Sequence, residues 1–163
     1  MENLRKPDPR FSAAALAAVL FGELRLPPGT RFKLAYSGGL DSHVLLHALA
    51  TLRTSHSFAL SAIYIDHGLQ PSATAWGEHC ARICAQLDVA FVCERTEVSG
   101  AAEHGLEAAA RRARYKALRA LLAPGEILLT AHHRNDQAET VLLQLLRGAG
   151  VAGLAAMPVR AAF

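Results

Sequence analysis

Cysteine, aromatic side chains and long apolar runs are all scarce in this sequence of 163 residues. Three cysteines without a Cys-X-X-Cys pair argue against a disulfide framework and against an iron–sulfur or zinc-ribbon site. No apolar run approaches the roughly 20 residues of a membrane span. The stretch Phe11–Phe21 imitates a signal peptide, but acidic residues flank it, so we expect a short amphipathic helix. We therefore expect a soluble, cytoplasmic protein without membrane contact.

The remaining composition is that of a folded domain. Hydrophobic residues make up 52% and charged residues 19%, which excludes intrinsic disorder, and the length predicts about one domain. The formal charge of +3 is too small to indicate by itself that the protein binds nucleic acid.

Apolar runs typical of strands alternate with segments of helical spacing. The expected strands are Arg31–Tyr36, Ala59–Ile65, Val89–Cys93 and Glu126–Ala131. The expected helices are Leu40–Leu52, Ser72–Leu87 (capped by Ser72 or Thr74), His104–Leu122 and Gln137–Arg147. This alternation predicts an α/β fold with a doubly wound, mainly parallel sheet of about five strands. Such sheets bind ligands at the carboxyl ends of their strands.

The segment SGGLDS follows the first expected strand and opens a helix. Paired glycines let backbone N–H groups approach an anion, and the helix start adds donors and the positive end of its dipole. The segment is neither a Walker loop nor a GxGxxG fingerprint. It predicts a phosphate cradle; the alternative is a plain turn capped by Asp41 or Ser42. The expected ATP-binding residues are Ser37, Gly38, Gly39, Leu40, Asp41 and Ser42.

Two further segments follow in the chain. Asp66, His67 and Gly68 end the second expected strand, where the alternative is an ordinary turn with a left-handed Gly68. In EAAARRARY, Arg111 and Arg114 project onto the arc that holds Leu118. They would meet phosphate or developing negative charge, unless Arg111 only pairs with Glu107. The cluster Arg112, Lys116 and Arg119 is expected on a solvated outer face.

The last polar segment is HHRNDQAET. Asp136 and Glu139 have the spacing of a capping box, with Asp136 as the N-cap. The alternative is that the two carboxylates hold Mg²⁺ between ATP phosphates. His132 and His133 should point to different sides, so they are not expected to chelate one metal together.

SGGLDS resembles the signature of the PP-loop ATP pyrophosphatases, which have an adenine nucleotide alpha hydrolase-like fold. With DHGL, EAAARRARY and LLTAHHRNDQAETVLLQLLRGAGVAGLAAM in order, residues 32–157 look like the catalytic domain of the bacterial tRNA(Ile)-lysidine synthetase family. One departure is Asn135, where family members often have aspartate, so the catalytic carboxylate falls on Asp136.

The resemblance implies an ATP-dependent carbon–nitrogen ligase. ATP would adenylate the wobble cytidine of the CAU anticodon of tRNA(Ile) at carbon two, and free lysine would then displace AMP. It implies catalytic roles for Arg111, His133 and Asp136. The residues that it implies as ligands of Mg²⁺ are Asp41, Asp136 and Glu139. Substrate-binding candidates are Asp66, His67, Gly68, Arg114 and Glu139.

The resemblance also implies a domain plan: residues 1–30 as a helix and lead-in, and residues 31–163 as the PP-loop domain. Family members continue into C-terminal tRNA-binding domains. This chain has one short basic face, Arg112, Lys116 and Arg119, to meet tRNA phosphates, and only 6% aromatic residues to stack on anticodon bases. It should therefore bind ATP without efficient lysidine formation. Two rival functions are a tRNA thiolation enzyme, which usually needs a Cys-X-X-Cys pair, and a non-catalytic adenine-nucleotide-binding module.

Overall fold

The computed structural model describes residues 11–69, 73–99 and 105–163. The chain divides into two compact units, Met1–Leu129 and Thr130–Phe163. The division falls inside the PP-loop domain expected over residues 31–163. The expected cap Ser72 and the expected helix start at His104 lie outside the described residues.

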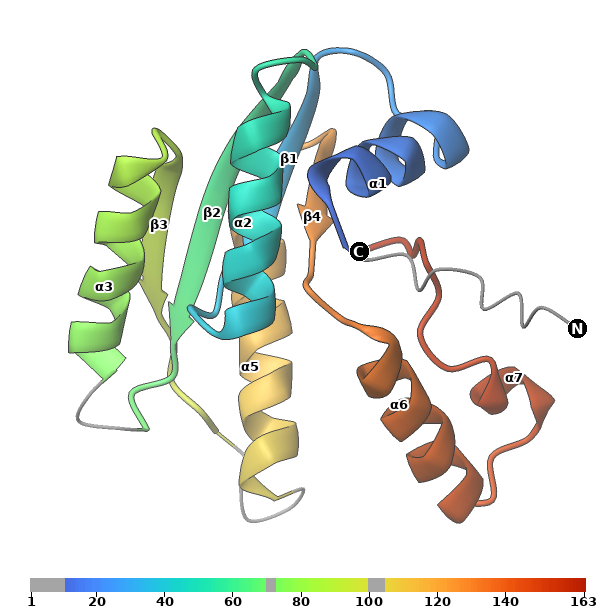
Figure 1. Ribbon diagram of the computed structural model, residues 1–163. Coiled ribbons are helices and arrows are strands. Elements are labelled where there is room, and N and C mark those ends of the chain that lie inside the picture. The colour runs from blue at the N-terminus through green and yellow to red at the C-terminus, as the bar shows by residue number, and fades with distance from the viewer. Residues whose placement is uncertain (1–10, 70–72, 100–104) are drawn as a thin grey trace, which may run out of the picture. The chain divides into compact units, whose positions relative to one another are not determined.

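The first unit is built on a parallel sheet with the strand order β3-β2-β1-β4 (Figure 1). The strands are β1 (Thr30–Ala35), β2 (Phe58–Asp66), β3 (Ala90–Arg95) and β4 (Glu126–Leu129). The expectation of about five strands is wrong for the described residues, because the chain continues from β4 into helices without a further strand. β4 ends two residues before the expected Ala131.

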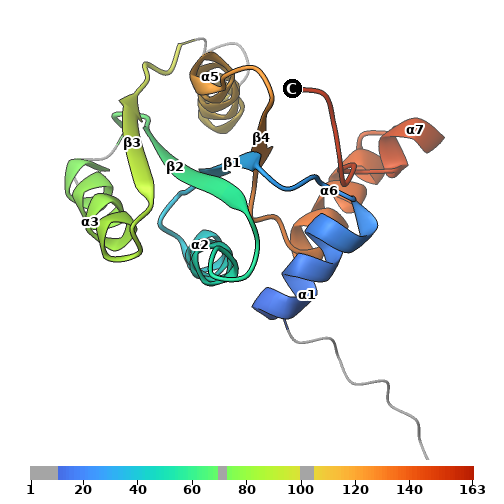
Figure 2. The same cartoon turned by 90° about the horizontal axis from the view of Figure 1, so that it is seen from above.

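Helices cover both faces of this sheet, as a doubly wound fold requires (Figure 2). On one face lie α2 (Leu40–Leu52) and α3 (Ala73–Gln86), and on the other lies α5 (Leu106–Leu121). The expected amphipathic helix near the N-terminus is present as α1 (Ala13–Ala17), which continues as a π-helix over Ala18–Glu23 and contacts α2.

The alternation of side chains along each strand explains the two cores. One face of the sheet carries the side chains of Phe32 and Leu34 in β1 and of Tyr36 just after it. They pack with residues of α2 and α3 such as Leu46 and Cys80. The opposite face of β2 carries a second cluster, Ile63 and Ile65 with Leu118 of α5. Because apolar side chains cover both faces, the strands read as nearly continuous apolar runs.

The strand order places a topological switch point beside β1. The chain leaves β1 through α2 toward β2 on one side, whereas β4 pairs with β1 on the other. Open α/β sheets bind ligands outside the carboxyl ends of strands at such a point. SGGLDS begins at Ser37, two residues after β1 ends at Ala35, so it lies at this position.

The second unit contains α6 (Arg134–Leu146) and α7 (Val151–Leu154). Gln137 ties α6 to the segment after α7, because its side-chain amide donates to the Met157 carbonyl at 2.9 Å and its Oε1 accepts from the Met157 N–H at 3.1 Å. α6 begins three residues before the expected Gln137. Across the described ranges, we find no helix with both the length and the apolar character to cross a membrane.

Candidate functional site at the strand ends

In the loop after β1, residue 38 has a backbone conformation that favours glycine. Gly38 has a φ of +76°, and an added Cβ would lie 2.6 Å from Trp76 Nε1 and 2.7 Å from Cys80 Sγ. A side chain there would suffer both backbone strain and a clash. Gly39 is the N-cap of α2, so the alternative interpretation, in which Asp41 or Ser42 caps the helix, is wrong.

Hydroxyl groups hold the loop closed from inside. Ser42 is 4% exposed, and its Oγ donates to the Gly39 carbonyl at 2.9 Å. Ser37 Oγ lies 3.1 Å from Ser42 Oγ and accepts from the Gly39 N–H at 3.3 Å. These bonds fix the backbone before any ligand arrives, which is the condition for strong electrostatic binding without reorganisation.

Trp76 is a contributor that the sequence analysis did not identify. Its indole Nε1 donates to the Ser37 carbonyl at 2.9 Å from the first turns of α3. Cys80 lies four residues later and is fully buried against the same loop. The signal for this contact was present in the sequence, because the spacing of Trp76, Cys80 and Cys84 repeats every four residues and so marks one helix face.

Leu40 and Asp41 face outward at the start of α2. Leu40 is 77% exposed, and Asp41 is an exposed acid in the first turn. The first helical turn also presents backbone N–H groups that have no partner within the helix. An anion at this position would meet the positive helix end, and a cation bound to that anion would meet the Asp41 carboxylate.

The turn after β2 is organised by Asp66. Asp66 is 7% exposed, and its Oδ1 accepts the Gly68 N–H at 2.7 Å, which forms an Asx-type turn. Gly68 has a φ of +63°, so the left-handed turn of the simpler interpretation is present. This role makes Asp66 a residue that shapes the turn.

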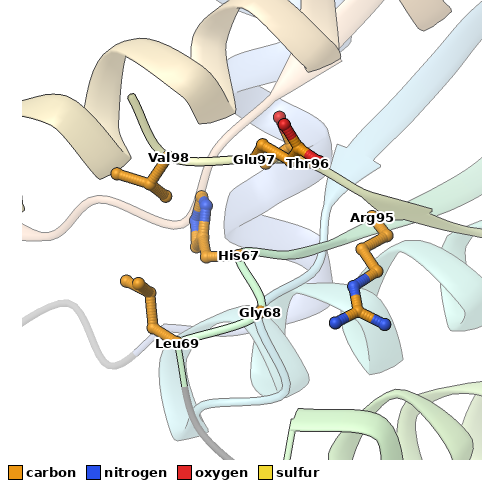
Figure 3. Close-up of a pocket in the computed structure, with 7 residues that line it drawn as sticks. All are labelled: His67, Gly68, Leu69, Arg95, Thr96, Glu97 and Val98. Atoms are coloured by element: carbon orange, nitrogen blue, oxygen red, sulfur yellow. The ribbon is translucent and has the colours of Figure 1, made fainter. Parts of the chain in front are cut away.

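A pocket of about 490 Å³ opens at the carboxyl ends of β2 and β3 (Figure 3). In Figure 3 the side chains of His67 and Arg95 stand on opposite sides of Gly68. The Nδ1 atom of His67 is buried without a hydrogen-bond partner. The pocket is lined by His67, Gly68, Leu69, Arg95, Thr96, Glu97 and Val98.

Arg114 acts electrostatically on the same histidine. Burial, and then the nearby Arg114 guanidinium, lower the pKa of His67, while Asp66 acts in the opposite direction. The register explains the approach: Leu118 packs on Ile63 and Ile65, so Arg114, one turn earlier on α5, falls beside the residue that follows β2. His67 is therefore held neutral.

Arg111 does not lie on a buried surface, which corrects that expectation. It is exposed, its guanidinium donates to Tyr115 Oη at 3.3 Å, and its Cζ lies 4.9 Å from the Tyr115 ring centroid. The reason is that the N-terminal part of α5 extends beyond the strand ends, as Figure 1 shows. No ion pair between Glu107 and Arg111 is present among the described contacts of α5. Arg112, Lys116 and Arg119 are exposed, as expected.

The second unit corrects the expected helix cap. His133 is the N-cap of α6: its Nδ1 accepts from the Asp136 N–H at 3.3 Å, and Asp136 Oδ2 accepts from the His133 N–H at 2.7 Å. Asp136 is thus the third residue of a capping box and not its cap. Glu139 is exposed on α6. His132 bonds elsewhere, with its Nδ1 3.0 Å from Thr130 Oγ1, so the two histidines do diverge.

The candidate residues thus gather in two groups. SGGLDS, the turn at Asp66–Gly68 and Arg114 belong to the carboxyl edge of the first unit's sheet, whereas His133, Asp136 and Glu139 belong to the start of α6 in the second. Within the described ranges, no cluster of three or more His, Cys, Asp or Glu side chains is arranged to hold a metal ion.

Comparison with known proteins gives the family. Residues 14–163 match the family model described as a PP-loop domain. The tRNA(Ile)-lysidine synthase of Coxiella burnetii is 51% identical over 83% of this chain and 30% of its own length. Those of Alkalilimnicola ehrlichii and Pseudomonas putida are 52% and 56% identical, over 93% and 77% of this chain and 33% and 29% of theirs.

A solved structure supports the fold. The U34-tRNA thiolase NcsA from Methanococcus maripaludis, with its 4Fe–4S cluster, superposes with a TM-score of 0.70 at 18% identity over 88% of this chain and 51% of that one. The chain spans about a third of the length of the curated relatives it matches. It belongs to the PP-loop domain family, and its resemblance to the tRNA(Ile)-lysidine synthetases is confirmed.

Proposed function

We propose that this PP-loop domain is the ATP-binding portion of an enzyme that attaches lysine to carbon two of the wobble cytidine in tRNA(Ile). The observation that carries the proposal is the closed SGGLDS loop at the switch point, in a chain about half identical to proteins named tRNA(Ile)-lysidine synthase. ATP would adenylate the carbon-two oxygen with loss of pyrophosphate, and the lysine amine would then displace AMP.

The loop would receive the phosphates of ATP. Backbone N–H groups of Gly38 and of residues 40–42, together with the positive end of α2, would supply donors for pyrophosphate as it leaves. Mg²⁺ fits this position, because it binds through one or two carboxylates together with phosphate oxygens and water, and Asp41 offers an exposed carboxylate. When bound, Mg²⁺ would offset the developing charge.

The turn after β2 would contribute to substrate binding. His67 is kept neutral, and its buried Nδ1 has hydrogen-bonding capacity for a polar substrate group in the pocket. Asp66 holds that turn in shape, and Arg114 adds positive charge beside it. Arg111 would stabilise the negative charge of the adenylated intermediate.

The start of α6 would supply the proton acceptor. The lysine ammonium must lose a proton before its amine can attack, and a carboxylate or imidazole can take it. The capping box uses Asp136 Oδ2 and His133 Nδ1, so we assign the proton to Asp136 Oδ1. His133 would take it only at Nδ1, with loss of its bond from the Asp136 N–H. Glu139, exposed one turn later, is assigned to substrate or Mg²⁺.

Two of the three cysteines, Cys80 and Cys84, favour this ligase over a thiolation enzyme. Cys80 and Cys84 are fully buried, and burial raises the pKa of each thiol to about 11. Neutral thiols packed into the core are poor nucleophiles and poor cluster ligands, because the thiolate is the reactive form. Both cysteines therefore serve the packing of α3 against the loop.

A domain exchange tests the proposal. Residues 14–157 of this chain would replace the matching part of the Coxiella burnetii relative, and the chimera would be assayed for lysine incorporation into a tRNA(Ile) transcript. We expect incorporation that depends on ATP, with one pyrophosphate released per lysine. A soluble chimera that instead incorporates sulfur, or that binds ATP without any lysine transfer, would contradict the proposal.

Two variants of the chimera assign the roles. Asp41→Asn should retain the fold and lose pyrophosphate release. Asp136→Asn retains an oxygen that can accept the His133 N–H, so α6 should stay capped while lysine transfer falls by orders of magnitude. The matched control is Glu78→Gln, an exposed acid on α3 outside both groups. Undiminished lysine transfer by Asp136→Asn would show that Asp136 has a purely structural role.

A further inference from the structure

Two histidines on α2 face each other just beyond the phosphate loop. His43 Nε2 lies 3.1 Å from His47 Nε2, and the two ring centroids are 4.6 Å apart. They stand one helical turn apart, so both side chains lie on the same face of the helix. His47 is exposed to solvent, and His43 is half-buried beside it. Neither residue has a part in the ligase reaction proposed above.

The separation of the two nitrogens suits a shared metal ion. Two imidazole nitrogens bound at about 2.05 Å to one ion lie about 2.9 Å apart at a right angle and about 3.3 Å apart at the tetrahedral angle. The observed 3.1 Å falls between these values. An ion would therefore enter the pair with a small movement of the exposed His47 ring.

A buried tyrosine orients the first ring. Tyr36 Oη lies 2.9 Å from His43 Nδ1. Tyr36 is 1% exposed, and burial raises its pKa to about 12, so it remains a neutral phenol. When Nδ1–H donates to Tyr36 Oη, the lone pair of His43 points from Nε2 toward His47. A hydrogen bond of this kind is the usual support of a metal-binding histidine.

We propose that His43 and His47 bind one divalent transition-metal ion, with Zn²⁺ as the ion of choice, through their two Nε2 atoms. Water completes the coordination, because the described residues hold no cluster of three or more ligands around it. The N–H that lies between the nitrogens moves to Nδ1 of His47 through solvent, so the neutral pair binds without net proton release. Imidazole favours zinc, copper and nickel over magnesium.

Binding would have a structural consequence for the loop. The ion would join the first and second turns of α2, whose N-terminus carries SGGLDS. Since a ligand that binds only the folded chain stabilises it, Zn²⁺ should raise the unfolding temperature in a concentration-dependent way.

The test is a calorimetric titration with ZnCl₂ under excess MgCl₂ and without ATP, on the chain without a histidine tag. Cys93 is the exposed thiol, so Cys93→Ser serves as the background for all variants. We expect one ion per chain. His43→Gln and His47→Gln should each weaken binding at least tenfold and reduce the rise in unfolding temperature accordingly. His56→Gln, a half-buried histidine outside the pair, should change neither.

Cu²⁺ supplies a second readout that does not depend on affinity. Its paramagnetic resonance spectrum should show two equivalent imidazole nitrogens in the background protein and one in His47→Gln. Unfolding without metal checks that this exposed substitution leaves the fold intact. Equal zinc affinity in the background and His47→Gln proteins, no zinc binding at all, or a copper spectrum with one nitrogen in both would overturn the proposal.

Discussion

The loop after β1 and the turn after β2 follow neighbouring strands of one sheet, but different hydrogen bonds hold their backbones. In the first, Ser37, Ser42 and Trp76 bond the loop from inside and from α3. In the second, one carboxylate shapes the turn, and His67 Nδ1 is buried without a partner beside a pocket. The first loop has its binding geometry built in, whereas the second turn retains hydrogen-bonding capacity for a substrate.

Substitution of Gly38 should break the first loop most severely. Gly38→Ala places an alanine at φ +76° with its Cβ 2.6 Å from Trp76 Nε1. The left-handed backbone costs about 1–2 kcal/mol, and overpacking costs about 1–3 kcal/mol more. We expect the free energy of unfolding in urea to fall by the sum, and ATP binding to be lost.

A matched control separates the two costs. Gly29→Ala has a similar φ of +80° but no atom within 4 Å of the added Cβ, so only the backbone cost applies. Equal losses of stability in the two variants would mean that the contact with Trp76 and Cys80 does not constrain the loop.

Loss of the indole hydrogen bond should have a smaller effect. Trp76→Phe keeps a ring over Gly38 but removes the donor to the Ser37 carbonyl, which costs about 1 kcal/mol. ATP affinity, measured by calorimetry, should fall several-fold because the loop must then order on binding. Tyr64→Phe removes a long bond of 3.5 Å to the Ala73 carbonyl and should leave ATP affinity unchanged. Equal ATP affinity in Trp76→Phe and the parent chain would contradict preorganisation by Trp76.

The second turn should make stability depend on pH. The pKa of His67 is lowered in the folded chain from its ordinary value of 6.5, so the unfolded chain binds more protons below that pH. The stabilising contribution is complete above pH 6.5 and is lost as the pH falls toward the folded-state pKa. His67→Gln should therefore flatten the decline in urea stability between pH 7 and pH 5. His43, which also has a lowered pKa, is present in both proteins and cancels in the comparison. Parallel curves would show that His67 is protonated equally in both states.

The smallest expected effect concerns the charge of Arg114 beside His67. Arg114→Gln should raise the pKa of His67, followed by nuclear magnetic resonance of its ring protons, because the guanidinium disfavours imidazolium. Arg112→Gln, an exposed arginine of the same helix, serves as the control. A shift of the same size in both variants would mean that Arg114 acts only through net charge.

The sequence was most informative where the signal is local. Apolar runs of strand length and helical spacing predicted the order of β1 to β4 with α2, α3, α5 and α6, since both patterns depend on neighbours in the chain. Errors arose where two local solutions compete. Asp136 and Glu139 have the spacing of a capping box, but His133 and Asp136 form one a turn earlier, because the imidazole Nδ1 accepts a backbone N–H in the same way.

The sequence by itself determined the alternating α/β order, the glycine-rich loop after β1 and the acidic turn after β2. Only the tertiary structure decided which distant side chains complete them: Trp76 against Gly38, and Arg114 beside His67. It also decided that Arg111 is exposed, because the length by which α5 overhangs the strands determines what its arginines face. Helix periodicity fixes the direction of a side chain, but the packing of another element determines what lies in that direction.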